Sequence, residues 1–187
     1  ILEHSGARVV VAWPGTADLV ESATEGLDGL TRVMLREPRA GWTSLDELAD
    51  DDVVFLPDVG SPVVWASRYL TMNGRRRIIG SLSHGSMANA VTQAVGAQAV
   101  DPTRQVVAMA GDGGLAMMLG ELMSFVQNGL PVKTLVFDND SLNFVELEMM
   151  AAGFVPYGTS LENPDFAAIA ERIRPGTVLP APVGVFP

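Results

Sequence analysis

The sequence contains no cysteine and only two histidines, His4 and His84, among its 187 residues. The lack of cysteine excludes disulfides, thiolate nucleophiles and cysteine-based metal sites. Two histidines are too few for a multi-histidine zinc site within one chain. No apolar run is long enough to span a membrane, and the first residues do not resemble a secretory signal. We therefore expect a cytoplasmic protein with no membrane segment.

Basic side chains are also scarce, with 12 Lys and Arg against 22 Asp and Glu, which gives a formal net charge of −10. Nucleic acids and anionic membranes bind surfaces with excess positive charge, so we expect no nucleic-acid partner. The three consecutive arginines at 75–77 are accordingly predicted to form a solvated turn or the rim of a subunit interface.

Short apolar runs alternate with helix-like stretches and with turns rich in glycine or proline. Strands are predicted over 8–13, 31–35, 53–56, 76–79, 105–110 and 132–137, and helices over 17–29, 61–72, 86–100, 115–127 and 164–173. This alternation predicts an α/β fold, a doubly wound parallel sheet with helices on both faces. Ligands of such sheets bind at the carboxyl ends of the strands, where the loops 57–61, 80–87, 111–114 and 138–143 are expected.

Two helix starts carry a recognisable signal. Ser61 and Asn163 are each followed directly by proline. A small polar residue before proline is typical of a helix N-terminus. Both residues are therefore predicted to be N-caps.

The turn Gly111-Asp112-Gly113-Gly114 lies between a predicted strand and a predicted helix. Glycines let backbone N–H groups approach a ligand, and a helix N-terminus favours an anion such as phosphate. The Asp112 carboxylate would repel that phosphate unless a divalent cation lay between them, and the combined oxygens suit Mg²⁺. Asn139 follows the next strand, 27 residues later, and is predicted to be a second metal ligand.

Two other interpretations of this turn stay open at this point. Residues 111–116 also match the dinucleotide-binding pattern G-x-G-x-x-A, in which Asp138 would hold a ribose. The turn could also be purely structural, with no ligand.

A more specific resemblance extends over about residues 45–172. It is carried by residues 58–62, 83–90, 96–98, 105–114 and 144–149. These stretches resemble the thiamine diphosphate-dependent pyruvate oxidases and quinone-dependent pyruvate dehydrogenases. The resemblance implies the diphosphate-binding domain of that family, with its thiamine diphosphate-binding fold, thiamine diphosphate and Mg²⁺ as cofactors, and oxidative decarboxylation of pyruvate or a similar 2-keto acid.

The resemblance also implies individual roles. The implied metal ligands are Asp112, Asn139 and the backbone carbonyl of Ser141. The other implied cofactor-binding residues are Gly60, Ser61, Gly85, Ser86, Met87, Gly111, Gly113 and Gly114. Among them, Gly113 and Gly114 would cradle the diphosphate. Gly85 would offer its carbonyl to the aminopyrimidine ring, and Met87 would force the bent conformation of the cofactor. The substrate end would be lined by Phe144, Val145 and Glu148.

The rest of the family's chain is a pyrimidine-binding domain, which supplies a catalytic glutamate, and an FAD-binding domain. We expect residues 1–44 to be a remnant of the first, with Glu37 a relic of that glutamate. Residues 45–174 would form the diphosphate domain and 175–187 a proline-rich tail, in a truncated chain with no FAD site.

Such a chain is expected to be inactive alone and to pair with the pyrimidine-binding domain of another chain or as a homo-oligomer. The alternatives are a non-catalytic or split-subunit assembly module and a nicotinamide dinucleotide-binding domain.

Overall fold

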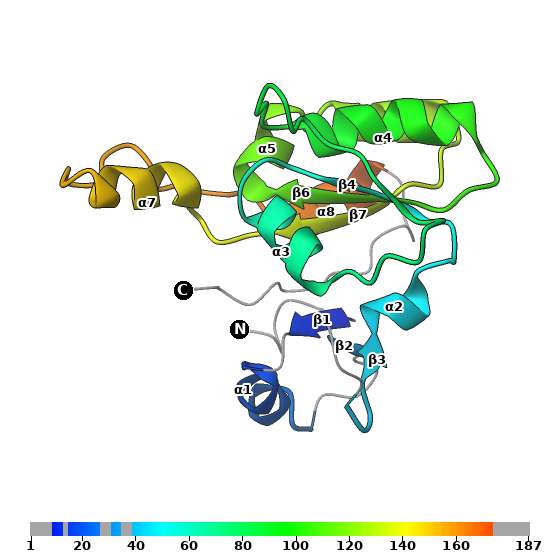
Figure 1. Ribbon diagram of the computed structural model, residues 1–187, viewed down its shortest axis with the longest axis horizontal. Coiled ribbons are helices and arrows are strands. Elements are labelled where there is room, and N and C mark those ends of the chain that lie inside the picture. The colour runs from blue at the N-terminus through cyan, green and yellow to red at the C-terminus, as the bar shows by residue number, and fades with distance from the viewer. Residues whose placement is uncertain (1–8, 13–14, 27–30, 35–38, 174–187) are drawn as a thin grey trace.

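The computed structural model describes residues 9–12, 15–26, 31–34 and 39–173. Two parallel sheets follow one another along the chain (Figure 1). Glu37 and the tail 175–187 lie outside the described residues, so the expectations for them stay predictions.

The larger sheet has four parallel strands in the order β5-β4-β6-β7. They are β4 (Val54–Pro57), β5 (Arg77–Ile78), β6 (Val106–Gly111) and β7 (Lys133–Phe137). The two central strands are buried along almost their whole length. This explains their unbroken apolar sequence, because a strand covered on both faces has no solvent side to carry polar residues.

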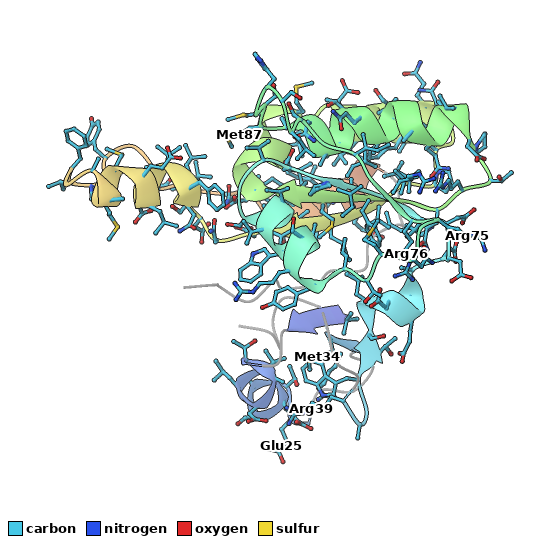
Figure 2. The ribbon with its side chains drawn as sticks, viewed as in Figure 1. Glu25, Met34, Arg39, Arg75, Arg76 and Met87 are labelled. Atoms are coloured by element: carbon cyan, nitrogen blue, oxygen red, sulfur yellow. The ribbon has the colours of Figure 1, made fainter. Side chains whose placement is uncertain are left out.

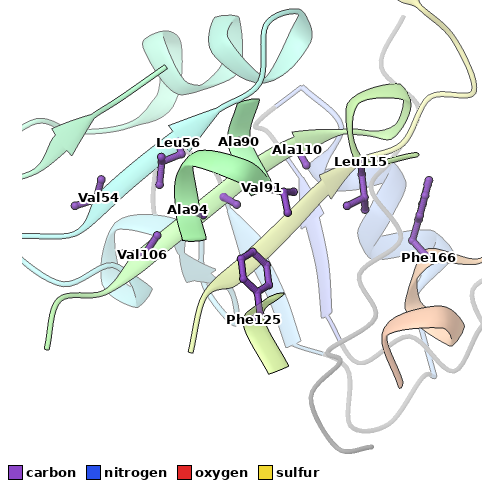
Figure 3. Close-up of a cluster of buried hydrophobic side chains, with 11 residues drawn as sticks. Val54, Leu56, Ala90, Val91, Ala94, Val106, Ala110, Leu115, Phe125 and Phe166 are labelled. Atoms are coloured by element: carbon purple, nitrogen blue, oxygen red, sulfur yellow. The ribbon is translucent and has the colours of Figure 1, made fainter. Parts of the chain in front are cut away.

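Helices cover both faces of this sheet, which confirms the predicted doubly wound α/β fold. Val54 and Leu56 of β4 pack on one face with α4 (Asn89–Val100), α6 (Glu121–Gln127) and α8 (Phe166–Ile173), as Figure 3 shows. Phe55, between them in the sequence, points to the other face and packs with Ala66 of α3 (Ser61–Tyr69). The alternation is that of side chains along a strand.

The carboxyl ends of the strands lie together, as predicted. Pro57 pairs with Met109 and Gly111 pairs with Phe137 in the parallel register. The loops that follow β4, β6 and β7 therefore leave the sheet at one edge, where ligands of such sheets bind.

The helix predicted over 115–127 is instead two helices, α5 (Asp112–Met117) and α6. The chain departs from helical geometry at Met118 and resumes after Gly120, and glycine is a weak helix former. Since α5 starts at Asp112, Gly113 and Gly114 lie within its first turn rather than before it.

Both predicted N-caps are wrong. Gly60 precedes α3 with φ of 122°, a value that favours glycine, and no side chain caps this helix. At α8 the cap is Asp165, whose carboxylate accepts a hydrogen bond from the Ala168 N–H at 2.8 Å. The amide of Asn163 points elsewhere, into the site described below.

A smaller sheet precedes the larger one. It contains β1 (Val9–Ala12), β2 (Thr31–Met34) and β3 (Thr43–Ser44), all parallel, with α1 (Ala17–Ala23) beside them and α2 (Leu45–Leu48) after them. Met34 and Trp42 form a small core with Ala17. Val33 and Leu45 pack against Tyr69, Leu70 and Leu135 of the larger unit.

Arg76 corrects the prediction that 75–77 is a solvated run. Its side chain is only 7% exposed and pairs with the Asp46 carboxylate. The guanidinium also donates to the carbonyls of Asp46, Ala49, Asp50 and Thr71 at 2.9–3.2 Å. Arg76 thus joins α2 to the chain before β5 (Figure 2), while Arg75 is exposed as predicted.

Across the part of the chain that the structure describes, no helix is both long and apolar enough to cross a membrane.

Candidate functional site

A cleft opens at the carboxyl edge of the larger sheet, with an empty volume of ≈ 610 Å³ counted to its open mouth. Its walls come from the ends of β4, β6 and β7 and from the starts of the helices that follow them. The predicted site residues that line it are Gly60, Ser61, Met87, Gly111, Asp112, Gly113, Gly114, Asn139, Ser141, Phe144 and Val145. Segments far apart in the sequence therefore meet where the sheet fold predicts a ligand.

Asp112 and Asn139 lie next to each other in this cleft. Asp112 is 4% exposed, and its Oδ2 accepts a hydrogen bond from the Asn139 N–H at 3.2 Å. Its Oδ1 accepts one from the Gly113 N–H at 2.8 Å. The side-chain Oδ1 of Asn139 in turn accepts the Ser141 N–H at 3.2 Å. The three predicted metal ligands thus belong to one hydrogen-bonded group.

The segment 159–161 braces the loop that carries Asn139 and Ser141. Ser141 and Ser160 form an antiparallel bridge. The Leu142 N–H donates to the Thr159 carbonyl and the Leu161 N–H to the Asp140 carbonyl, both at 2.8 Å. This pairing fixes a loop that would otherwise leave its backbone polar groups unpartnered.

Two features of this loop hold its shape. Asp140 has a left-handed backbone with φ of 54°, a conformation that Asp tolerates better than most residues. The Ser141 hydroxyl donates to the Glu146 carboxylate at 2.6 Å.

Asn163 is a residue of the site that sequence reasoning missed. Its Nδ2 donates to Oδ2 of Asp112 and to Oδ1 of Asp138, both at 2.8 Å, and lies 3.2 Å from Oδ1 of Asp140. Partial burial raises the pKa of the Asp138 carboxyl, the Asn163 hydrogen bond opposes that rise, and the negative charge of Asp112 adds to it. The Asn-Pro pattern concealed this role because it indicated a helix cap.

Asp58 is a second missed residue, although it lies in the stretch that carried the resemblance. It is 1% exposed at the end of β4. Its Oδ1 accepts the Ala90 N–H at 2.9 Å and its Oδ2 the Gly111 N–H at 3.1 Å. Burial raises the pKa of this carboxyl, and the backbone hydrogen bonds oppose the rise. An acid placed directly after an apolar strand was the available signal.

Close packing of the protein itself requires Gly114, and Gly113 is closely packed as well. A Cβ on Gly114 would lie 2.1 Å from Oδ2 of Asp58, and one on Gly113 would lie 2.9 Å from Cδ2 of Leu142. The sequence interpretation assigned both glycines to the approach of a ligand. Their first role in the structure is to let the start of α5 meet β4 and the 138–142 loop.

The loop 80–87 contributes Met87 to the cleft, beside α5 (Figure 2). Gly85 has φ of 70° and its N–H donates to the Ser81 carbonyl, while the Ser86 N–H donates to the Ser81 hydroxyl. Gly85 and Ser86 are exposed and do not line the cleft.

Phe144 and Glu148 lie on α7 (Asn143–Ala151), which projects away from the sheet in Figure 1. No residue of this helix is buried. Phe144 lines the cleft, whereas Glu148 is exposed and does not. The substrate role of Glu148 therefore stays a prediction.

The donor set fits Mg²⁺. Asp112, Asn139 and the Ser141 carbonyl offer only oxygen atoms, the ligands that Mg²⁺ prefers. From the described part of the chain, Oδ1 of Asp112 accepts a single hydrogen bond, which leaves a direction for a cation. Within the described ranges, no three His, Cys, Asp or Glu side chains could hold a metal by themselves. The amide and carbonyl oxygens are therefore essential to any site here.

Comparison with known proteins agrees with this geometry. The sequence pattern of the family "Thiamine pyrophosphate enzyme, C-terminal TPP binding domain" matches residues 58–179; thiamine pyrophosphate (TPP) is another name for thiamine diphosphate. The match begins directly after β4 and spans β6, β7 and the loops that form the cleft. It favours the thiamine diphosphate interpretation of the glycine turn over the dinucleotide and purely structural ones.

Individual relatives are similar over about half to three quarters of the chain. YdaP of Bacillus subtilis, which is named as a thiamine pyrophosphate-containing protein, is 35% identical over 135 residues, 72% of this chain and 24% of YdaP. Pyruvate oxidase of Lactiplantibacillus plantarum is 30% identical over 70% of this chain and 22% of its own length. The acetolactate synthase large subunit of Parasynechococcus marenigrum is 38% identical over 54% and 16%.

The chain thus spans about a quarter or less of the length of these curated relatives. The family pattern, by contrast, covers most of the chain, including every loop at the carboxyl edge of the larger sheet. This chain belongs to the thiamine pyrophosphate enzymes and carries their C-terminal TPP-binding domain.

Proposed function

We propose that this chain holds the diphosphate of thiamine diphosphate through a Mg²⁺ ion, with Asp112, Asn139 and the Ser141 carbonyl as protein ligands. The observation that carries the proposal is the contact between Asp112 and the Asn139 N–H at 3.2 Å. It unites two residues that are 27 positions apart in the sequence at the ends of neighbouring strands.

The charge of the chain supports a metal-mediated site. A buried carboxylate repels an adjacent diphosphate at short range, and a divalent cation between them reverses that interaction. The chain carries a net charge of −10, and none of the described residues that line the cleft is Lys or Arg. Metal and backbone N–H groups, rather than basic side chains, are the groups that would hold the anion.

The other residues of the cleft receive positioning roles in this proposal. Gly60, Ser61 and Gly111 would lie along the diphosphate, and Gly113 and Gly114 allow the turn that presents it. When bound, thiamine diphosphate supplies an electron sink for the decarboxylation of a 2-keto acid.

Proposed roles can also be given to the residues expected near the pyrimidine and the substrate. Met87 would support the cofactor from below, with Gly85 and Ser86 at its pyrimidine end. Phe144 and Val145 would form an apolar wall that excludes water from the substrate. Phe144 is 38% exposed and Val145 45%, so this wall needs a cover from outside the described residues.

For the whole protein we propose oxidative decarboxylation of pyruvate or a similar 2-keto acid. Pyruvate oxidase among the relatives supports it, although acetolactate synthases match as well. A pyrimidine-binding domain, from another chain or a second copy, would complete the site, so the chain alone would bind the cofactor weakly and be inactive. In this proposal residues 1–44 are the remnant of a pyrimidine-binding domain, residues 45–174 form the diphosphate domain, and residues 175–187 are the proline-rich tail.

One observation favours the split-subunit alternative. α7 and the residues after it expose a run of apolar side chains, each at least half exposed: Leu147, Met150, Phe154, Val155 and Tyr157. Such a surface indicates a protein partner. A partner that co-purifies with the chain and restores pyruvate turnover would support the split enzyme, and a stable inert complex would support a non-catalytic assembly module.

Calorimetric titration with thiamine diphosphate in excess Mg²⁺ tests the proposal. We expect the wild-type chain to bind and Asp112→Ala to give no measurable binding heat, because the buried carboxylate ligand is lost. Asp51→Ala removes the same charge from an exposed residue before β4, at the opposite end of the strand, and should bind like wild type. Equal binding by Asp112→Ala would refute the metal assignment.

A further inference from the structure

We propose that Asn163 is a positioning residue for the metal ligand Asp112. Its amide holds Oδ2 of the Asp112 carboxylate and thereby directs Oδ1 to the cation. The inference rests on the proposed function and adds a residue to its site.

The two carboxylate oxygens of Asp112 have different hydrogen-bond partners. Oδ2 accepts two hydrogen bonds, from the Asn139 N–H at 3.2 Å and from Nδ2 of Asn163 at 2.8 Å. Among the residues that the structure describes, Oδ1 accepts a hydrogen bond only from the N–H of the next residue. A carboxylate oxygen has two lone-pair directions, so Oδ2 is fully used and Oδ1 has one left. The free direction belongs to the oxygen that Asn163 does not touch.

The amide also separates like charges. Its Nδ2 lies 2.8 Å from carboxylate oxygens of both Asp112 and Asp138 and 3.2 Å from one of Asp140. Among the described residues, no Lys or Arg forms an ion pair with any of these three acids. Besides the backbone N–H groups that also donate to Asp112 and Asp138, one neutral amide therefore contacts all three acids and bridges them before a cation arrives.

A neutral donor suits this position better than a basic one. A lysine or arginine here would neutralise Asp112 and compete with the cation for its charge. An asparagine supplies two directed hydrogens and no charge, which fixes the carboxylate without lowering its attraction for the metal.

The backbone ties Asn163 to the other two ligands. The residues just before it, 159–161, pair with 140–142. The 138–142 loop carries Asn139 and Ser141, so the amide of Asn163 moves with that loop. It therefore links the ligand on α5 to the ligands after β7, and all three keep one relative geometry.

Mn²⁺ binding to the full chain, followed by electron paramagnetic resonance at saturating thiamine diphosphate, tests this role. Mn²⁺ takes the same oxygen ligands as Mg²⁺. Asn163→Leu keeps the side-chain shape and removes both hydrogens, and we expect the Mn²⁺ dissociation constant to rise about 10–100-fold, the usual effect of losing such a supporting contact. The matched control is Asn128→Leu, an exposed asparagine at the end of α6, which should bind like wild type.

The outcomes separate the two proposals. A wild-type chain that binds no Mn²⁺ would refute the metal site itself. A wild-type chain that binds, with Asn163→Leu within about twofold of it, would overturn the positioning role alone.

A second variant guards against misfolding of the first. Asn163→Asp should lower the melting temperature in EDTA, because it places a fourth carboxylate beside those of Asp112, Asp138 and Asp140, and like charges repel. Mg²⁺ with the cofactor should then raise that temperature by more than in wild type. An unchanged melting temperature in EDTA and an unchanged Mg²⁺ shift would contradict the proposal.

Discussion

At the residue scale, the tightest constraint is the contact between Gly114 and Asp58. The Asp58 carboxylate is buried and held from both sides by backbone N–H groups of Ala90 and Gly111. It cannot move away without losing those bonds, and a Cβ on Gly114 would lie 2.1 Å from its Oδ2 and 3.2 Å from the Ala88 N. The ends of β4 and β6 and the starts of α4 and α5 therefore pack together around the Asp58 carboxylate and Gly114.

Gly114→Ala tests this contact. We expect the free energy of unfolding to fall by about 1–3 kcal/mol, the usual cost of overpacking a close-packed interior, and cofactor binding to weaken because Gly111–Gly114 shifts. Urea unfolding followed by circular dichroism gives the free energy.

Gly96→Ala is the matched control, since Gly96 also lies within a helix but a Cβ there would meet nothing within 4 Å. It should stabilise the chain by up to about 1 kcal/mol, because alanine is the better helix former. Equal stability of the two variants would show that the Asp58 contact imposes no constraint.

The sequence allowed part of this site to be predicted. Asp112 and Asn139 were found because each follows an apolar strand, and parallel strands end at one edge. Asp58 and Asn163 were missed because their roles depend on contacts with backbone or side chains 25 to 53 positions away, which no local pattern records.

At the element scale, Arg76 connects α2 to the larger sheet through several hydrogen bonds. Its guanidinium satisfies four carbonyls and one carboxylate at the amino end of the strands. Arg76→Met should lower the free energy of unfolding by about 3 kcal/mol, because buried acceptors lose their donor. Urea unfolding measures this loss, and the distant cofactor site should bind within about twofold of wild type.

The neighbouring Arg75→Met is the control. Arg75 is 67% exposed and lies 3.8 Å from Asp51, a surface pair whose loss costs no more than about 1 kcal/mol. Equal losses of unfolding free energy in the two variants would contradict the prediction that the buried hydrogen bonds of Arg76 stabilise the fold more than the exposed pair of Arg75 does.

Helix boundaries show where local patterns stop being sufficient. The apolar spacing over 115–127 predicted one helix, but the chain breaks before Gly120 and forms α5 and α6. The Asn163-Pro164 pair predicted a helix start, yet Asp165 caps α8. The first break coincides with glycine, a weak helix former, and at α8 the amide of Asn163 is held by the acids of the site and does not cap the helix.

At the scale of the whole molecule, the alternation of strands and helices was enough to predict the doubly wound sheet and the edge that holds the cleft. Alternation could not give the packing of the smaller sheet on Tyr69, Leu70 and Leu135, because those contacts depend on tertiary arrangement. The net charge of −10 supports the proposal that a cation helps to hold an anionic cofactor at this edge.

The free energy of unfolding of the wild-type chain, measured with thiamine diphosphate in Mg²⁺ and in EDTA, tests this dependence most directly. A ligand at 100 times its dissociation constant stabilises the folded state by about 2.7 kcal/mol. We predict stabilisation only when cofactor and Mg²⁺ are both present. Equal stabilisation by the cofactor in EDTA would contradict a diphosphate site built on Asp112 and Asn139.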